Sequence, residues 1–378
     1  MPRRIKVALA GLGSVSQRGI LPHLACEDAQ ERVETVACCD VVSGRARETA
    51  RKFGWKEAYE DYDELLRRAD VEAVLIATPI PAHYRQTMAA LAAGKHIYVQ
   101  KAMTTTLAEA NDVVAAAERA GVTLVASPGQ MLRPINQQLR DLIGRGAIGK
   151  VYWAFSTNAG GGHENEAFRA GDDVLSNVDP TWYYKKGGGP VYDMTVYSLH
   201  TLTGILGPVR AVTAMSGIGL PQRRWKDKVI DVEMDDNTLM LLDFGDSTFA
   251  VAGGQNAGVS RGIGWGRLAF FGTEGTIDMG GSVGGVEIVA PKELKGTLGF
   301  SGGAFVAQGG DGLPHVSGPH RGIQESHVYA DIMHLADCIV EGRQPVPSGQ
   351  HARHVVELIE LAYRSAQTGQ AQRLTTRF

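Results

Sequence analysis

Long apolar runs, paired cysteines and an excess of one charge are all missing from this 378-residue sequence. No apolar run of about 18 residues occurs, and glycine interrupts the first apolar stretch, so we expect neither a membrane span nor a secretory leader. The 38 Lys and Arg residues nearly balance the 41 Asp and Glu, which argues against the basic surface of a nucleic-acid-binding protein. The expected protein is cytoplasmic, with neither a nucleic-acid nor a membrane partner.

Cysteine is scarce, and its spacing excludes two further classes. Cys26, Cys38, Cys39 and Cys338 form no CxxC motif and no paired Cys and His spacing. Two of them are adjacent on an expected buried strand. We therefore predict reduced core thiols, with no disulfide framework and no metal site.

A glycine-rich turn follows the first apolar run and predicts a strand, a tight turn and a helix. Gly11 permits the sharp turn, and Ser16 takes the position where a helix must pack closely. Gly13, Ser14 and Val15 are the candidate contacts of a pyrophosphate at the helix N-terminus. A loop that is merely rich in glycine is the alternative.

A second apolar run, residues 33–39, ends in Asp40, at the distance expected of a strand-helix-strand unit. A carboxylate there accepts hydrogen bonds from ribose hydroxyls and repels a 2′-phosphate, so NAD is favoured over NADP. Arg45 and Arg47 are near enough in sequence to keep NADP open. A helix cap is the alternative role of Asp40.

Helical and strand-like segments then alternate, which is typical of a doubly wound parallel sheet. Helices are expected over 43–53, 82–93 and 107–120, and strands over 71–77, 96–99 and 122–126. Alternating apolar segments at 239–244, 248–252, 267–271 and 276–279 predict an antiparallel sheet, with a hairpin turn at 272–275, and helices follow at 325–341 and 349–366. The fold class is α/β, with a Rossmann domain over 1–127 and a domain with a large open sheet over 128–378.

The ends of two more parallel strands carry candidate cofactor contacts. Thr78 and Pro79 follow one strand, where the proline fixes the backbone, and His83 is either a cofactor contact or a surface or capping histidine. Gln100 and Lys101 follow the next strand. A cationic nicotinamide beside Lys101 would lower the pKa of its amine, which could then pass protons near neutral pH; a solvated surface lysine is the alternative.

A third segment combines a glycine-rich entry with titratable side chains. On an α-helix, Asp193, Tyr197 and His200 would fall on one stripe and point into one space. A helix cap for Asp193 and a core histidine for His200 are the alternatives. Glycines gather at 160–162, 187–189, 280–285 and 302–312, which we interpret as loops around a site. The candidate substrate contacts in such segments are Asn158, His163, Tyr184, Lys185 and His320.

These motifs resemble the Gfo/Idh/MocA oxidoreductases, typified by glucose-fructose oxidoreductase and inositol dehydrogenase. The run Gln100-Lys101-Ala102 is similar to the family's Glu-Lys-Pro, and the sequence leaves open whether the Lys101–Ala102 bond is cis, at a cost of ~3 kcal/mol. The segment 193–200 is similar to the family's Asp-x-Gly-x-His-x-x-Asp helix, with Tyr197 at the histidine position. The resemblance implies that an open sheet makes a homodimer or homotetramer.

The resemblance also implies hydride transfer between NAD and a secondary alcohol of a sugar, glycoside or cyclitol. Tyr197 would touch the reacting hydroxyl, Lys101 and Asp193 would relay or tune its proton, and His200 is the competing base. One alternative is a redox-neutral glycoside hydrolase that uses NAD catalytically, with an anionic sugar glycoside among its candidate substrates. The other is a non-catalytic NAD-binding sensor.

Overall fold

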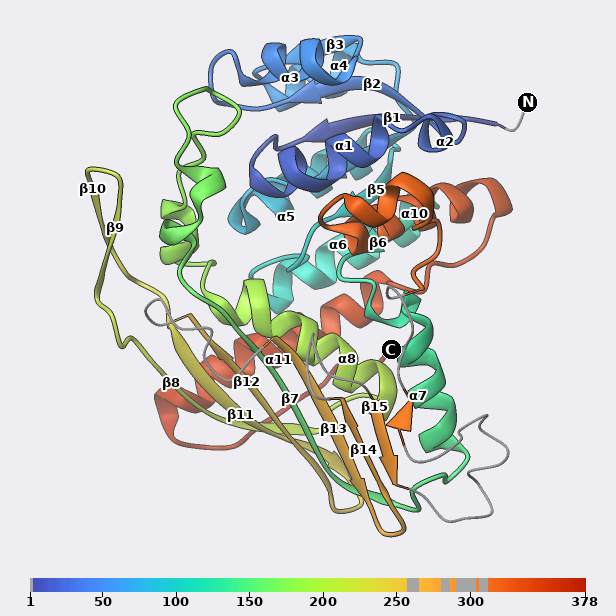
Figure 1. Cartoon of the computed structure of the whole chain (residues 1–378), viewed down its shortest axis with the longest axis vertical. Coiled ribbons are helices and arrows are strands. Elements are labelled where there is room, and N and C mark those ends of the chain that lie inside the picture. Colours follow the sequence, from blue (N-terminus) through green and yellow to red (C-terminus); the bar gives the residue numbers. More distant parts are fainter. Residues whose placement is uncertain (1–2, 257–264, 280–285, 290–303, 306–311) are drawn as a thin grey trace.

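The computed structural model of this protein describes residues 3–256, 265–279, 286–289, 304–305 and 312–378. Its two sheets lie at opposite ends of the molecule, the first at the top of Figure 1 and the second at the bottom. The helices of the C-terminal part lie between them. The structure therefore places two sheet domains one above the other.

Six strands form the first sheet in the order β3-β2-β1-β4-β5-β6, and every pairing is parallel. The strands are β1 (Ile5–Ala10), β2 (Val33–Cys39), β3 (Glu57–Tyr59), β4 (Ala73–Ile76), β5 (His96–Val99) and β6 (Leu124–Ala126). The strand order reverses between β1 and β4, which is where open α/β sheets bind ligands beyond their carboxyl ends. The predicted Rossmann sheet is confirmed.

Helices connect these strands, and local signals fix their ends. They are α1 (Leu21–Leu24), α2 (Glu27–Gln30), α3 (Arg45–Phe53), α4 (Tyr62–Arg68), α5 (Ile80–Ala92) and α6 (Leu107–Ala120), and a π-helical turn, Ser16–Ile20, precedes α1. Thr106 and Glu109 form a capping box that begins α6. Gly121, at φ 63°, ends the same helix.

The sequence did not predict β3 or α4, because a three-residue strand is too short to show a period. The helix predicted at 82–93 begins earlier, at Ile80. Pro79 is its N-cap and Pro81 lies in its first turn, where a missing N–H costs nothing.

In the described part of the chain, nine strands form the second sheet in the order β16-β15-β14-β13-β7-β12-β11-β8-β17. They are β7 (Val151–Ala159), β8 (Ala211–Gly217), β11 (Asn237–Gly245), β12 (Thr248–Gln255), β13 (Trp265–Gly272), β14 (Thr276–Met279), β15 (Val286–Val289), β16 (Ala304–Phe305) and β17 (Gln372–Arg373). Only the pairing of β7 with β12 is parallel. The predicted open, mostly antiparallel sheet and its 272–275 turn are confirmed.

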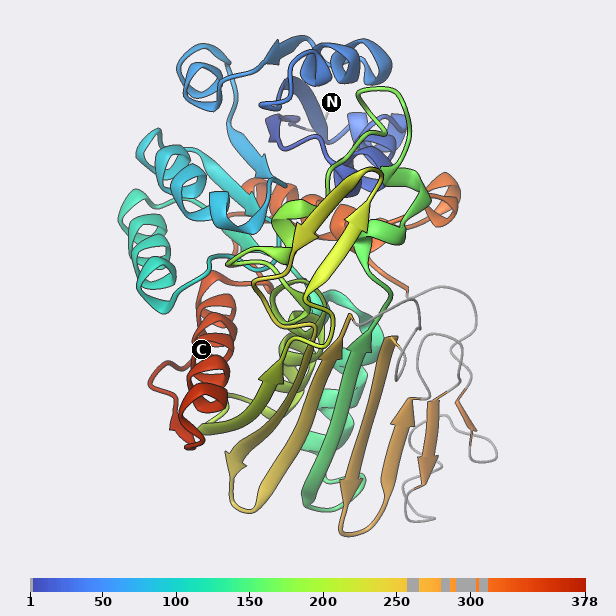
Figure 2. The ribbon, with the colours of Figure 1, turned by 90° about the vertical axis from the view of Figure 1, so that its left-hand side faces the viewer.

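Helices cover one face of this sheet, and Figure 2 looks onto the other. The covering helices are α8 (Val196–Leu206), which packs on the central strands, and α7 (Pro134–Gly144), which packs on α8. A two-stranded arm of β9 (Gln222–Trp225) and β10 (Lys228–Asp231) stands apart from the sheet. Short turns complete this part of the chain: η2 (Gln130–Leu132), η3 (His163–Asn165), η4 (Ala167–Arg169), η5 (Thr181–Tyr184), η6 (Val191–Thr195) and η7 (Gly318–Gly322).

Two C-terminal helices, α10 (Ser326–Glu341) and α11 (Gly349–Thr368), join the domains. Ile332 of α10 is buried in the same apolar cluster as Ile5 of β1, and α11 packs against both α6 and β8. Asp331 of α10 accepts a hydrogen bond from Ser127 Oγ at 2.8 Å. A division of the chain at residue 127 thus separates the two sheets. It does not separate their cores, because α10 follows residue 127 in the chain but packs in the core of the first sheet.

Among the described residues, no helix is both long enough and apolar enough to cross a membrane. All four cysteines are free thiols. Cys38, Cys39 and Cys338 are buried as expected, but Cys26 is only half-buried, so the prediction of a core thiol is wrong there. The glycine runs at 280–285 and most of 302–312 lie outside the described residues.

Candidate functional site

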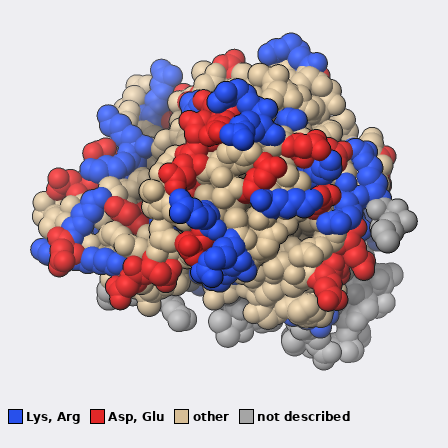
Figure 3. Space-filling model, turned by 90° about the horizontal axis from the view of Figure 1, so that it is seen from above, with Lys and Arg blue, Asp and Glu red and all other residues tan. Residues whose placement is uncertain are grey.

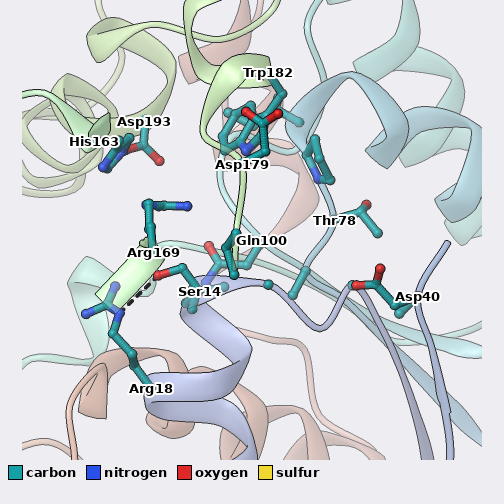
Figure 4. A pocket seen from close by; sticks show the side chains of 18 of the residues that line it. Ser14, Arg18, Asp40, Thr78, Gln100, His163, Arg169, Asp179, Trp182 and Asp193 are labelled. Atoms are coloured by element: carbon teal, nitrogen blue, oxygen red, sulfur yellow. Dashed lines mark hydrogen bonds and ion pairs between the residues drawn. The ribbon is translucent and has the colours of Figure 1, made fainter. Parts of the chain in front are cut away.

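Four strand ends of the first sheet open into one cavity of about 960 Å³. Gly11 follows β1, Asp40 follows β2, Thr78 lies just beyond β4, and Gln100 follows β5. In Figure 4, Asp40 and Thr78 lie at one side of this cavity, and His163 and Asp193 lie at the other. Residues 160–184, called the covering segment below, cross from the second domain and supply the opposite wall.

The glycine turn leaves no room for a side chain at its first position. Gly11 has φ 89°, and a Cβ there would lie 2.5 Å from the carbonyl carbon of Ala77. Ser16 Oγ donates a hydrogen bond to Gly11 O at 2.6 Å, which fixes the turn. Among the described residues, a Cβ on Gly13 would meet only Val178, at 3.7 Å, so the Gly13 backbone is accessible to a ligand. Ser14 and Val15 also line the cavity.

Asp40 lies against the turn rather than at a helix end. Its carboxylate accepts hydrogen bonds from Leu12 N at 2.8 Å and Val42 N at 2.9 Å, and the N-cap of α3 is Gly44. The alternative of a helix cap is therefore wrong. Arg45 Nη1 lies 3.3 Å from Asp40 Oδ1.

Each of the three guanidinium nitrogens of Arg45 already has an acceptor, Nη1 on Asp40 and the other two on backbone carbonyls. Its Nε donates to Val174 O and its Nη2 to Asn177 O, both at 2.9 Å. Both acceptors belong to the covering segment, so Arg45 joins it to the first domain. Arg47 is exposed and does not line the cavity.

Thr78 and Pro79 line the cavity, but His83 does not. His83 is fully buried on α5, with Nδ1 2.8 Å from Ala102 O and Nε2 2.8 Å from Thr78 O. Burial lowers the pKa of His83 to about 4. The structure thus corrects both expectations for His83, since an apolar environment and two backbone carbonyls hold it away from the surface and from the cavity. It positions the Lys101–Ala102 turn, whose peptide bond is cis.

Gln100 and Lys101 face the cavity at the end of β5. Gln100 Oε1 accepts a hydrogen bond from Lys101 N at 2.9 Å, and its buried Nε2 has no partner among the described residues. Lys101 Nζ contacts the Asp193 carboxylate and donates to Asp193 O at 2.9 Å. Lys101 is therefore no solvated surface lysine, because its side chain is only 14% exposed and ion-paired.

Asp193 lies between Lys101 and His163. Its Oδ2 is 3.0 Å from His163 Nε2, and His163 Nδ1 is 2.8 Å from Glu166 Oε1. Burial alone would raise the pKa of Asp193, but the charge of Lys101 and the hydrogen bond from His163 hold that pKa well below its ordinary value. Burial would lower the pKa of His163, but its two carboxylate partners raise it. The result is a row of alternating charges from Lys101 to Glu166.

Tyr197 lies beside this row and contacts a histidine that sequence reasoning missed. Its hydroxyl is 2.9 Å from His327 Nε2, at the start of α10, and Lys101 Nζ is 5.3 Å from its ring centroid. Burial, and then the carboxylates around it, raise the pKa of Tyr197 well above its ordinary value. Sequence gave no signal for His327, because 130 positions separate it from Tyr197.

The structure does not bring His200 into this space. Asp193 lies in the π-helical turn η6, where each residue turns through a smaller angle than in an α-helix, so the predicted stripe fails beyond Tyr197. His200 is buried among helices instead, with its ring 4.6 Å from that of His351. Burial and two neighbouring histidines hold the pKa of His200 well below its ordinary value. His200 is therefore a core histidine, which was the alternative to a catalytic base.

Two predicted substrate contacts are held by other partners in the second domain. Asn158 is buried in β7, where it accepts a hydrogen bond from Ser198 Oγ. Tyr184 is buried in a small apolar cluster, and its hydroxyl contacts Glu164. Neither side chain lines the cavity.

The side chains of Lys185 and His320, two more predicted substrate contacts, also lie outside the cavity, where each has another partner. Lys185 pairs with Glu233 at 2.8 Å. His320 is buried beside His23 on another side of the first domain, with its Nε2 2.9 Å from Asp28. Of the five predicted substrate contacts, His163 alone lines the cavity.

Several lining side chains were not singled out from the sequence. Arg18 donates from Nε to Ser14 Oγ at 3.0 Å and pairs with Glu325 at 2.7 Å. Arg169 pairs with Glu166 in the covering segment. Three indoles, those of Trp182, Trp225 and Trp265, line the remaining wall. These residues come from segments far apart in the sequence, so no spacing connected them.

The surface above the first domain carries charges of both signs. On the face in Figure 3, Lys and Arg side chains alternate with Asp and Glu. Neighbouring opposite charges cancel beyond about 10 Å at ordinary ionic strength. The described charges that matter for a ligand are therefore those inside the cavity.

A Rossmann domain whose Lys101 shares one cavity with acid and phenol side chains of a second domain defines a class, the two-domain nucleotide-binding oxidoreductases. Residues 5–127 match the model "Oxidoreductase family, NAD-binding Rossmann fold", and residues 136–278 match the "GFO/IDH/MocA C-terminal domain". The chain belongs to the GFO/IDH/MocA oxidoreductase family, which confirms the resemblance.

Its relatives include enzymes named for sugar substrates. The chain is 32% identical over 205 residues to dTDP-3,4-didehydro-2,6-dideoxy-alpha-D-glucose 3-reductase of Streptomyces violaceoruber, a match that spans 54% of this chain and only 55% of the reductase. It is 26% identical to D-apiose dehydrogenase of Paraburkholderia graminis, over 98% of this chain and 90% of that one. Levoglucosan dehydrogenase in complex with NADH and levoglucosan has the same fold, with a TM-score of 0.79 at 19% identity over 99% of this chain and 100% of that one.

Proposed function

We propose that this protein transfers a hydride between NAD and a secondary alcohol of a sugar, a glycoside or a cyclitol. The observation that carries the proposal is the ion pair of Lys101 with Asp193, beside Tyr197, in the same cavity as the glycine turn and Asp40. NAD, when bound, supplies the hydride acceptor. The side chains of the protein supply position and proton transfer.

The lining fits a dinucleotide. Gly13 leaves the turn open to a pyrophosphate, with Ser14 and Val15 at the helix N-terminus. The buried Gln100 Nε2, which has no partner among the described residues, is a donor suited to the carboxamide oxygen of a nicotinamide. Thr78 and Pro79 would flank the same part of the cofactor.

NAD is the proposed cofactor rather than NADP. The Asp40 carboxylate would accept from ribose hydroxyls and repel a 2′-phosphate. Arg45, the nearest cation, is already held by Asp40 and by two carbonyls of the covering segment.

Tyr197 is the proposed contact of the reacting hydroxyl. The phenol keeps its proton at neutral pH, because its pKa is raised. As the alcohol carbon loses its hydride, Tyr197 O accepts the alcohol proton and its own proton passes to His327 Nε2, 2.9 Å away. Lys101 stabilises the negative charge that develops on the alcohol oxygen, and Asp193 holds the lysine in place.

The cavity favours an uncharged substrate. Lys101, Arg169 and Arg18 are each paired with a carboxylate within it. The pair Lys185 and Glu233 lies outside, so the lysine gives no support to an anionic glycoside. Three indoles provide the apolar and aromatic wall typical of small-molecule sites.

The test is NADH formation by the purified protein across a panel of sugars, cyclitols and glycosides. Lys101→Ala should lower kcat by about 100-fold or more. Lys185→Ala, which removes a lysine outside the cavity, is the matched control and should leave kcat unchanged. Equal rates for both variants would contradict the proposal.

The same assay separates the alternatives. A dehydrogenase forms one NADH for each substrate molecule oxidised. Release of sugar from a glycoside without net NADH would indicate the redox-neutral hydrolase instead. NAD binding with no turnover on any substrate of the panel would support the sensor.

We also propose that the open sheet face forms a homodimer. Large apolar side chains stand on it, with Met215 80%, Leu241 57% and Phe249 48% exposed. The strand register places further apolar side chains beside these. Leu239 pairs with Met215, and Trp153 pairs with Phe249. A contiguous apolar face of this kind is typical of a protein interface, and a homotetramer would need a second one.

A further inference from the structure

A cluster of metal-ligating groups lies outside the cavity. The Cys26 thiol, the Asp28 carboxylate and a ring nitrogen of His320 all lie within 4.8 Å of one another. Cys26 precedes α2 and Asp28 is within it, whereas His320 belongs to η7, so 292 positions separate Asp28 from its histidine. We call these three residues the Cys26–Asp28–His320 cluster. Sequence spacing predicted no metal site, because the ligands come from two distant segments.

A second imidazole fixes the orientation of His320. His320 Nδ1 is 2.7 Å from His23 Nδ1, and His23 Nε2 is 3.0 Å from Gln324 O. The two rings are nearly parallel, at 10°, and both stack on Tyr329, at centroid distances of 4.2 and 4.6 Å. His320 therefore presents its Nε2, and no other atom, to Asp28.

A continuous row of contacts runs from the cluster into the protein. Three contacts join Asp28, His320, His23 and Gln324 O in sequence. A metal cation between Asp28 and His320 is compatible with this row. His320 Nδ1–H then donates to His23, and His23 Nε2–H donates to Gln324 O.

We propose that the Cys26–Asp28–His320 cluster binds one zinc ion, with water in the fourth position. Thiolate, imidazole and carboxylate are the ligands that Zn²⁺ takes, and tetrahedral coordination needs four. Asp28 is about half exposed, which leaves that position open to solvent. Binding displaces the thiol proton of Cys26 and the Nε2 proton of His320 into solvent.

The ion would join the start of α2 to η7, which precedes α10. His23 lies on α1, and Gln324 immediately precedes Glu325, which pairs with Arg18 beside Ser14. Zinc at this place would therefore stabilise the fold next to the proposed cofactor site, without contributing a ligand to the cavity.

The test uses the full chain after chelator treatment. Calorimetric titration should find one zinc ion per chain, and the melting temperature should rise with zinc concentration. Cobalt, used in place of zinc, should give a thiolate-to-metal absorption band. Cys26→Ser and Asp28→Asn should each weaken zinc affinity at least tenfold and remove the zinc-dependent rise in melting temperature.

Cys338→Ser is the matched control, since the Cys338 thiol lies 3.4 Å from His334 Nε2 but belongs to no such cluster among the described residues. It should keep wild-type zinc affinity. A readout without any variant is the rate of Cys26 alkylation, which zinc should slow. No binding by the wild type at micromolar zinc, affinity unchanged in both ligand variants, or a cobalt spectrum without a thiolate band would each overturn the proposal.

Discussion

Tyr197 and His327 are the residues on which the proposed proton transfer depends most. Tyr197→Phe removes the hydroxyl while keeping the ring that packs against Trp265, so kcat should fall by about 100-fold. His327→Gln should also lower kcat, because its side chain cannot accept the phenol proton. The double variant should lose little more than Tyr197→Phe alone. Losses that multiply in the double variant would show that the two residues act independently.

Asp40 should set the cofactor preference. In Asp40→Ser the 2′-phosphate is no longer repelled and Arg45 loses one partner, so the ratio of kcat/KM for NAD to that for NADP should fall by at least about tenfold. Arg47→Ala is the control, because Arg47 is exposed outside the cavity. An unchanged ratio in Asp40→Ser would remove Asp40 from the ribose role.

For single residues, the sequence predicted which side chains line the cavity better than it predicted what each histidine does. Gly11, Asp40 and Lys101 were found because each follows a strand, and strand ends meet at one edge of a parallel sheet. His320 and His83 were misassigned because a histidine in a loop or at a helix start looks the same whether it is buried or exposed. Their burial depends on Tyr329 and Ala102, which no local pattern connects to them.

The covering segment should slow the release of the cofactor. The Arg18 guanidinium lies 4.1 Å from the centroid of the Phe168 ring, a contact worth roughly 0.5–1 kcal/mol at an exposed site. Phe168→Ala should therefore raise the NAD dissociation rate by about two- to fivefold, as measured by stopped-flow fluorescence. Tyr152→Ala, on the distant open sheet, is the control. Equal dissociation rates in the two variants would mean that the segment does not retain the cofactor.

Helices and strands with a clear period were predictable, and those shaped by tertiary contacts were not. β2 and β5 have the predicted bounds, since their buried runs end at polar residues. The π-helical turn η6 broke the predicted stripe, and nothing in the local sequence distinguishes it from the first turn of α8. The covering segment contains only short turns, so its position over the cavity could not be read from periodicity.

The whole molecule should lose stability in mild acid. Burial lowers the pKa of His83 and His354 to about 4 and that of His351 to about 3. Between about pH 6.5 and about pH 4 the unfolded chain binds these protons and the native one does not, so the free energy of unfolding falls by about 1.4 kcal/mol per pH unit for each histidine. Asp331, whose pKa burial raises to about 7, acts in the opposite direction over the same pH range.

Denaturant unfolding across that range measures the slope. His351→Gln should reduce it by about one histidine's share. If the free energy of unfolding falls with pH as steeply in His351→Gln as in the wild type, His351 does not contribute to the acid sensitivity.

The assembly should depend on the open sheet face. Leu241→Asp places a charge among apolar neighbours, where Leu241 pairs with Val251, and should give a monomer by light scattering at micromolar concentration. Val229→Asp, at a residue that is 48% exposed on the two-stranded arm, is the control and should keep the wild-type mass. A wild-type monomer, or a Leu241→Asp variant that keeps its mass, would contradict the proposed dimer.

The return of α10 to the first sheet limits how this chain can recombine with its relatives. A chimera that imports a foreign segment 1–127 would set new β1 side chains against the resident Ile332 and Met333 of α10. The side chains of β1 and α10 that pack together come from the same chain and fit each other. A cofactor domain transferred between relatives must therefore include its own α10, although that helix lies some 200 residues further along the chain.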